Sequence, residues 1–313
     1  MGFNEKQRCR KSSLEELGCL FQKESSYRYM KGPHEHEESI NAISSHWRHK
    51  ICDWYYEFVD HYNFDREVVG VAISYFDRYI SSQKSCEDVH TKDKYQIIAV
   101  TSLFLAIKLH SISEDCLVQN RSLAMSRLLY GQVDPQEIYE MEMDILEQLD
   151  WRLNPPTLHM FALNFSQLHP LGDCCSTTMS YLYEATRYQV ELAIFIPALL
   201  ERFASSVIVN AALKNTEEKI ASENPHILTT DMKQSFEALM KDSFVAIDPT
   251  DVSQCQLSLK RLCPQLPSLE YFGSDEDYTV FPSDDYNAQE DSKEETPHVT
   301  SMSPMNVIDY CTK

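Results

Sequence analysis

Apolar residues recur at intervals of three and four over most of the chain between residues 45 and 264. The first such stripe comprises Trp47, Ile51, Trp54 and Phe58. Because these intervals place side chains on one face of an α-helix, the stripe predicts a first helix that ends near Tyr62. The next stripe predicts a second helix as far as Ile80, with Asp65 as its N-cap.

The third predicted helix is apolar almost all round over residues 97–107, with Asp93 before it as the N-cap. A helix of this kind is stable when other helices surround it, so it belongs at the centre of a bundle. A short fourth helix is expected at about Ser122–Tyr130. The segment Asp134–Glu137 has a capping residue, a proline and a glutamate in the order that starts a helix, and it predicts a fifth.

The segment Asn154–Thr157 contains two prolines and separates these helices from a second set. Five further helical stretches are expected, at residues 158–168, 176–194, 203–215, 229–245 and 251–262. The predicted fold is all-α, with two tandem five-helix bundles over residues 45–156 and 157–264. The flanking parts are expected to be a flexible N-terminal segment (1–44), with one short helix at Ser13–Phe21, and an acidic disordered tail (265–313).

Composition narrows the class of function. Seven glycines in 313 residues are too few for a fold built on tight hairpins or on loops that cradle phosphate. The net charge is −20, and the segment Gly273–Lys313 holds ten acidic residues against two basic ones. Binding to a phosphate backbone usually requires a basic surface, so nucleic acid is not an expected partner.

Ten cysteines are scattered without a C-x-x-C pair, and the adjacent Cys174 and Cys175 suit neither a zinc site nor a structural disulfide. Charges interrupt each apolar stretch near the N-terminus, and the longest apolar run, Leu192–Leu200, is too short to cross a bilayer. The sequence therefore predicts reduced thiols, a location in the nucleus, the cytoplasm or both, and no association with a membrane.

The patterns for nucleotide binding, for a nucleophilic serine and for zinc proteases are absent. The nearest group of metal ligands is His34–Glu38, where adjacent residues on one segment favour a solvated stretch over a metal site. Glu140 and Asp144 are interpreted as a solvated helix face, and His159 and His169 as structural residues. We therefore expect no catalytic residue, no cofactor and no metal, and a protein that works by binding other proteins.

Five segments, taken in order, resemble the cyclin box. They read W-R-H-K-I-C-D-W from Trp47, F-D-R-E-V-V-G-V-A-I-S-Y from Phe64, D-R-Y-I-S from Asp77, L-F-L-A-I-K-L from Leu103 and M-E-M-D-I-L-E-Q-L-D-W-R-L-N-P-P-T from Met141. The resemblance covers residues 46–157, and a looser one, best at Phe203–Lys214, suggests a second cyclin fold. The sequence of these segments also has a slight similarity to algal cyclins, those of diatoms included.

The resemblance implies a regulatory subunit that binds and activates a cyclin-dependent kinase and so controls cell-cycle progression, with kinase substrates and inhibitors as further partners. It also implies the contact residues. Lys108 and Glu142 match the charged pair that holds the kinase, and Leu109, Leu146 and Trp151 match apolar positions around it. Interpreted without the resemblance, a lysine at a helix end and a glutamate on a helix surface are ordinary.

Other positions of the box match residues with different implied roles. Arg48 and Asp53 match structural positions and are interpreted as an internal pair. The substrate-docking groove of the family maps onto Trp47, Ile51, Trp54 and Gln96. Two departures stand out. Lys50 replaces an apolar groove position and would repel a basic substrate motif, and His110 and Ser111 replace two glutamates beside the kinase contact.

In the acidic tail, Thr296 and Ser303 each precede a proline and resemble phosphorylation sites that direct cyclin turnover, with a merely solvating tail as the alternative. The basic cluster Lys6–Lys11 is a candidate nuclear signal. The alternative to a cell-cycle cyclin is a cyclin-fold adaptor, or a cyclin that serves transcription or nutrient signalling without a direct role in division.

Overall fold

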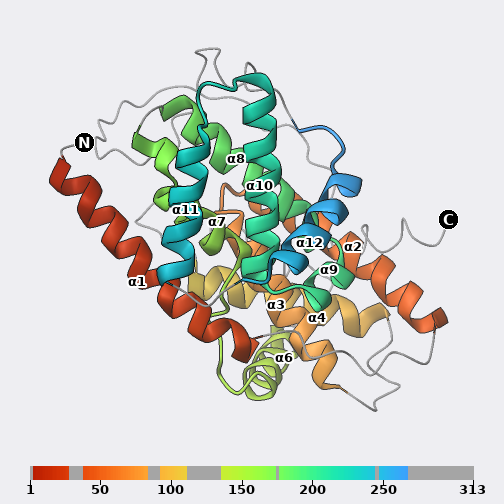
Figure 1. Cartoon of the computed structure of the whole chain (residues 1–313). Coiled ribbons are helices and arrows are strands. Elements are labelled where there is room, and N and C mark those ends of the chain that lie inside the picture. The colour runs from red at the N-terminus through yellow and green to blue at the C-terminus, as the bar shows by residue number, and fades with distance from the viewer. Residues whose placement is uncertain are drawn as a thin grey trace, which may run out of the picture.

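The computed structural model describes residues 3–27, 38–83, 92–110, 135–173, 176–243 and 247–266, and every regular element in these ranges is helical (Figure 1). The first half contains α1 (Phe3–Tyr27), α2 (Glu38–His61), α3 (Glu67–Ser82), α4 (Lys92–His110) and α6 (Pro135–Gln148). The second half contains α7 (Leu158–Leu168), a 3-10 turn (Pro170–Asp173), α8 (Ser176–Ile194), α9 (Pro197–Arg202), α10 (Ser205–Glu223), α11 (Thr230–Ser243) and α12 (Pro249–Leu262). The all-α prediction is confirmed.

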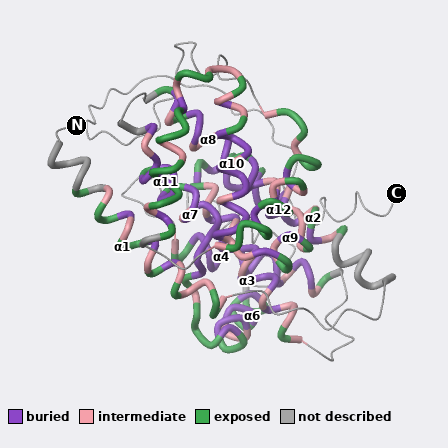
Figure 2. Tube along the Cα trace, in the orientation of Figure 1, coloured by how far each residue is buried: buried purple, intermediate pink, exposed green. Residues whose placement is uncertain are grey.

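Helices α4 and α10 are largely buried within their halves, as their apolar sequences predict. Helix α4 packs against α3 and α6, and α10 packs against α7, α8 and α12. Buried apolar side chains occur over most of the circumference of both helices, and Figure 2 shows buried stretches along them. Helices with so wide an apolar face are stable only when other helices cover them.

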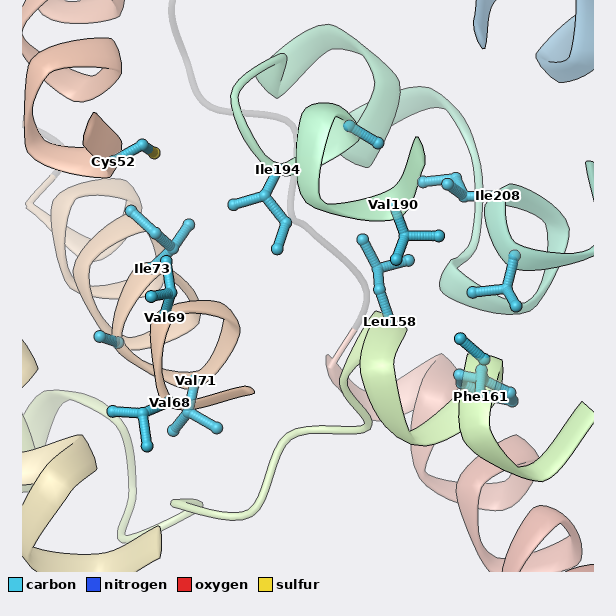
Figure 3. Packing of buried hydrophobic residues seen from close by; sticks show 14 of the residues in the cluster. Cys52, Val68, Val69, Val71, Ile73, Leu158, Phe161, Val190, Ile194 and Ile208 are labelled. Atoms are coloured by element: carbon cyan, nitrogen blue, oxygen red, sulfur yellow. The ribbon is translucent and has the colours of Figure 1, made fainter. Parts of the chain in front are cut away.

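The two halves share one hydrophobic core. Figure 3 shows Val69 and Ile73 of α3 on one side of the junction, with Leu158 of α7 and Ile194 of α8 on the other. All four side chains are buried. Because buried side chains of both halves belong to this one core, we expect the described parts of the two halves to move together.

Several helix ends agree with the predicted ones. Helices α7 and α8 have the predicted bounds, and Thr157 caps α7 by accepting a hydrogen bond from the Met160 N–H at 3.1 Å. Asp65, predicted as the N-cap of α3, lies one residue before the observed N-cap Arg66, and its carboxylate accepts a hydrogen bond from the Glu67 N–H at 2.8 Å. Asp93 lies inside the first turn of α4 and is not the residue before it, so its carboxylate acts on the helix dipole.

The predicted helix 203–215 is wrong at both ends. Helix α10 continues to Glu223, and a separate short helix, α9, precedes it. Polar residues near the predicted end of this helix are buried and paired: Gln189 of α8 donates to Thr216 Oγ1 at 3.0 Å, and Asn215 donates to Gln189 Oε1 at 3.0 Å. Polar residues with internal partners of this kind belong to the core and do not end a helix.

The prediction of a flexible segment over residues 1–44 is wrong for its described parts. Helix α1 covers Phe3–Tyr27 and packs against α7, with Leu17 and Leu20 buried, and α2 already begins at Glu38. The apolar stripe of α1 is narrow, so its stability depends on a contact that the local sequence does not reveal. The predicted helix at Ser122–Tyr130 and the tail from residue 267 onward lie outside the described residues.

Candidate protein-binding edge at the ends of α4 and α6

The two charged residues assigned to partner binding meet in the structure. Lys108, in the last turn of α4, places Nζ 2.6 Å from Glu142 Oε1 on α6. The Lys108 side chain is 52% exposed, whereas that of Glu142 is 12% exposed. Because Lys108 is half solvated, the pair adds little to folding stability. An ammonium donor and a carboxylate acceptor at a fixed separation are nevertheless suited to a partner's backbone.

Apolar side chains with unusual exposure lie around this pair. Leu109 is 47% exposed, and Trp151, in the turn after α6, is 62% exposed. Tyr139, three residues before Glu142 and so on the same side of α6, is 60% exposed. Sequence reasoning missed Tyr139, although its spacing from Glu142 could have identified it. We name Lys108, Leu109, Tyr139, Glu142 and Trp151 the α4–α6 edge.

Leu146, which was predicted to border the contact, is 6% exposed and belongs to the core beneath the α4–α6 edge. It still acts on the edge through its backbone, because its carbonyl accepts a hydrogen bond from the Trp151 N–H at 3.0 Å. This bond closes the turn that follows α6.

The turn that presents Trp151 has an uncommon backbone. Asp150 and Trp151 have φ values of 51° and 57°, the left-handed region that residues other than glycine seldom occupy. Two consecutive residues in this region cost free energy, which the surrounding contacts must offset. The result is a large aromatic ring that lies outside the core.

Three side chains from α3 and α4 hold this turn. Arg78 donates to the carbonyl oxygens of Arg152 at 2.8 Å and Leu149 at 3.3 Å. The carbonyl of Leu153 accepts a hydrogen bond from Tyr75 Oη and lies 2.8 Å from His110 Nε2. These bonds satisfy carbonyls at and beyond the end of α6.

The burial of Tyr75 and Arg78 agrees with their role in positioning the turn that carries Trp151. Burial raises the pKa of Tyr75, so its hydroxyl stays protonated and can donate, and burial lowers the pKa of Arg78. Tyr75 is fully buried in the core, and His110 was interpreted from the sequence only as a lost contact charge. Both side chains also hold the backbone that carries Trp151.

The predicted internal pair of Arg48 and Asp53 does not form. Arg48 donates two hydrogen bonds of 2.8 Å to Asp77 and a third of 2.7 Å to the Ile194 carbonyl. Residues five apart on a helix point about 140° away from each other, so one helix cannot turn both side chains inward. Asp53 instead lies 3.8 Å from His49 on the surface.

The Arg48–Asp77 pair is buried at the junction of the two halves. Burial lowers the pKa of Arg48 and raises that of Asp77, since it opposes both charges. The paired geometry, with two parallel hydrogen bonds, is what keeps an ion pair stable in such a place. Arg48 is therefore structural, as predicted, but with a partner on α3.

Most of the predicted substrate-docking groove is buried. We name Trp47, Ile51, Trp54 and Gln96 the α2 groove. Ile51, Trp54 and Gln96 are 5% exposed or less, and Trp47 packs edge-to-face on Tyr95 with ring centroids 5.1 Å apart. Lys50 remains partly exposed beside them. Within the described residues, this face offers little apolar surface to a peptide.

Side chains with other chemistry are engaged in structural pairs. His159 Nε2 lies 3.4 Å from Glu191 and His169 Nε2 lies 3.0 Å from Glu217, all buried, which agrees with the structural roles predicted for both histidines. The described residues contain no cluster of three metal-ligating side chains, and His34–His36 lie outside them. Among the described helices, none combines the length and apolar character that a membrane span requires.

Comparison with known proteins identifies the domain that carries this edge. Residues 16–154 match the family profile described as "Cyclin, N-terminal domain". The chain is 30% identical over 146 residues to G1/S-specific cyclin-E1 of Gallus gallus, an alignment that covers 47% of this chain and 32% of that protein. It is 25% identical over 181 residues to Cyclin-A3-2 of Arabidopsis thaliana, covering 52% of this chain and 43% of that one.

The matched region therefore spans less than half the length of these relatives. A solved structure, a viral cyclin from herpesvirus saimiri, superposes with a TM-score of 0.53 at 16% identity and covers 79% of this chain and 97% of that one. At this identity the superposition supports the fold, and the profile match supplies the family. Residues 16–154 are therefore a cyclin N-terminal domain, distantly related to those of cyclins E and A.

Proposed function

We propose that this protein binds and activates a cyclin-dependent kinase, that the α4–α6 edge is the surface it uses, and that the complex controls cell-cycle progression. The observation that carries the proposal is the Lys108–Glu142 pair, 2.6 Å apart, with Leu109 and Trp151 exposed beside it. Proteins of the cyclin family are non-catalytic regulatory subunits of kinases. A binding edge without catalytic groups suits that role.

The chemistry of the α4–α6 edge suits a protein partner's backbone. The Lys108 ammonium has three donors, so it keeps its bond to Glu142 while it donates to a partner carbonyl. Glu142 accepts from a partner N–H at a fixed place on α6. Exposed aromatic and leucine side chains next to such a pair form the anchors that usually contribute most of the binding free energy.

Binding at this edge activates the kinase by moving the helix that carries its active-site glutamate. That movement completes the lysine–glutamate ion pair on which phosphoryl transfer depends. Activation in this scheme requires only a rigid surface, and the turn held by Arg78, Tyr75 and His110 provides one.

The proposal also includes where the protein acts and what else it meets. We propose a location in the nucleus, the cytoplasm or both, binding of kinase substrates and inhibitors, and phosphorylation of Thr296 and Ser303. Both phosphorylation sites lie outside the described residues. The burial of the α2 groove argues that substrates are held mainly by the kinase.

The test is co-purification of the full chain with a panel of cyclin-dependent kinases that includes division-linked and transcription-linked members. Lys108→Glu and Glu142→Lys should each weaken binding by at least about 2 kcal/mol, roughly thirtyfold in Kd, as expected for central contact residues. Kinase activation should fall in parallel. The kinase that is bound distinguishes a division cyclin from a transcription cyclin.

Two controls make the result specific. The double variant Lys108→Glu with Glu142→Lys restores an ion pair within the chain, so it should fold normally and still fail to bind. Lys214→Glu breaks a similar pair, 3.0 Å from Glu237 on the other half of the chain, and should leave binding unchanged. Normal kinase binding by both single variants would overturn the assignment of the edge.

A further inference from the structure

The N-terminal turns of α1 concentrate positive charge in an acidic protein. Lys6, Arg8, Arg10 and Lys11 occupy four of six consecutive positions, in a chain whose net charge is −20. Arg8 is exposed, and Lys11 is 79% exposed, with its Nζ 3.8 Å from Oε1 of Glu15, which is 71% exposed. Exposed side chains such as those of Arg8 and Lys11 add little to the packing of α1. The charges of these two residues are therefore available to an external partner.

The cluster precedes a hydroxyl at a regular spacing. Counted from Ser13, basic side chains stand two, three and five positions earlier, at Lys11, Arg10 and Arg8, and Leu14 follows directly. This is the arrangement of a substrate for a protein kinase with an acidic cleft, because spaced cations pair with its carboxylates while the apolar residue fixes the register.

Ser13 lies in the contact between α1 and α7. Its side chain is 2% exposed, and its hydroxyl donates to Gln167 Oε1 of α7. It continues the buried stripe of Leu17 and Leu20 at helical spacing. Gln167 itself is exposed, so Ser13 lies at the rim of the contact. A local opening of the first turns of α1 is enough to expose it.

A phosphate group does not fit at this position in the closed state. It carries about −1.5 to −2 charges at neutral pH and strongly disfavours a desolvated contact. Once Ser13 is modified, the open state of α1 is therefore the favoured one, and the helix leaves α7. The opening that admits a kinase is the same opening that the phosphate maintains.

The other end of α1 connects this event to both halves of the molecule. Glu24 accepts hydrogen bonds from the Ser206 N–H at 2.7 Å and the Ser206 hydroxyl at 2.8 Å, and so serves as a cap for α10, whose own N-cap residue offers none. The Tyr27 ring lies 4.9 Å from the Arg78 guanidinium, the group that holds the turn after α6. Release of α1 removes both contacts.

We propose that Ser13 is a phosphorylation site for a basophilic protein kinase, and that its modification detaches α1 from α7. The Ser13 Oγ attacks the γ-phosphorus of ATP, a new O–P bond forms, the bond to the β–γ bridging oxygen breaks, and ADP leaves. The hydroxyl proton passes to the carboxylate base of that kinase. The proposal does not depend on the function assigned to the α4–α6 edge.

The test uses the full chain, magnesium-ATP and a purified basophilic kinase, with sites mapped by mass spectrometry. We expect phosphate on Ser13 in the wild type. Arg10→Ala should slow the reaction roughly tenfold by removing one charged contact with the kinase.

Gln167→Ala and Leu17→Ala should speed phosphorylation of Ser13, the second by roughly tenfold or more, since both increase the open population of α1. Lys23→Ala, on the same helix but outside the cluster, should change nothing.

Hydrogen exchange on the phosphorylated chain provides the second measurement. The backbone amides of α1 should exchange faster than in the unmodified chain, and so should the Ser206 amide, which donates a hydrogen bond to Glu24. The neighbouring Ser12, which is exposed, is the internal control for the site. Phosphate on Ser12 alone, a rate indifferent to Arg10→Ala, or unchanged protection of α1 after modification of Ser13 would each overturn the proposal.

Discussion

The α4–α6 edge, apart from Tyr139, and the α2 groove are predicted from the same family resemblance, yet the fold exposes most of the first and buries most of the second. The difference is clearest in two tryptophans. Trp54 is 2% exposed and Trp151 is 62% exposed. Trp54 lies on the inner stripe of α2, with its ring centroid 5.4 Å from Tyr55 and 5.9 Å from Phe58. Trp151 lies beyond the end of α6 in a left-handed turn.

A motif therefore specifies which residue occupies a position, while the packing around that position decides whether a partner can reach it. At the α4–α6 edge, the chain uses polar side chains from α3 and α4 to hold a strained turn outward. In the α2 groove, aromatic neighbours take up the surface that a peptide would need. Only the first arrangement leaves anchor residues for binding.

The largest expected effect separates the two tryptophans. Trp54→Ala removes a buried ring and should lower the free energy of unfolding by about 3–5 kcal/mol. Trp151→Ala removes an exposed ring and should lower it by less than about 1 kcal/mol, while weakening kinase binding. Urea denaturation of both variants measures the contrast.

Trp54→Phe is the matched control, since it keeps an aromatic ring and removes the indole N–H, which has no hydrogen-bond partner among the described residues. It should lose less stability than Trp54→Ala. Equal losses of unfolding free energy in Trp54→Ala and Trp151→Ala would contradict the assignment of Trp54 to the core and Trp151 to the exposed edge.

A smaller effect is expected from the side chain that supports the turn. Arg78→Ala removes two hydrogen bonds from a charged donor to the carbonyls of Leu149 and Arg152, and should lower the free energy of unfolding by about 1.5–3 kcal/mol. The Trp151 and Arg152 amides should exchange faster. Arg152→Ala is the control, because its side chain donates elsewhere, to the Ser26 carbonyl at 3.2 Å. Similar exchange in both variants would show that Arg78 does not hold the turn.

The sequence predicted what depends on local pattern. The stripes and capping residues placed α7 and α8 at their observed bounds, and the family resemblance brought Lys108 and Glu142 together from 34 positions apart. Each of these features has a signal within a few residues, whether a helical stripe, a proline or a conspicuous motif.

What the sequence could not predict depends on contacts between distant segments. Helix α1 is stable because α7 covers its narrow stripe, and Arg48 is paired with a residue on another helix. The exposure of Trp151 follows from the left-handed backbone angles of Asp150 and Trp151, for which the local sequence gives no signal. It also depends on Arg78, which lies 73 positions earlier in the chain. Burial in the α2 groove likewise depends on how α2 and α4 meet.

The smallest effect tests why the α2 groove would not bind a peptide. Charge and burial are separate explanations: Lys50 repels a basic motif, and Ile51, Trp54 and Gln96 offer almost no surface. Lys50→Ile removes only the charge and should change stability by less than about 0.5 kcal/mol. If burial decides, a labelled peptide containing an arginine and a leucine should bind neither the wild type nor the variant in fluorescence anisotropy. Lys94→Ile, a neighbouring exchange on α4, controls for nonspecific apolar binding. Peptide binding gained by Lys50→Ile and not by Lys94→Ile would show that the charge of Lys50 alone prevents peptide binding in the α2 groove. The contrast between the α2 groove and the α4–α6 edge would then be one of charge and not of packing.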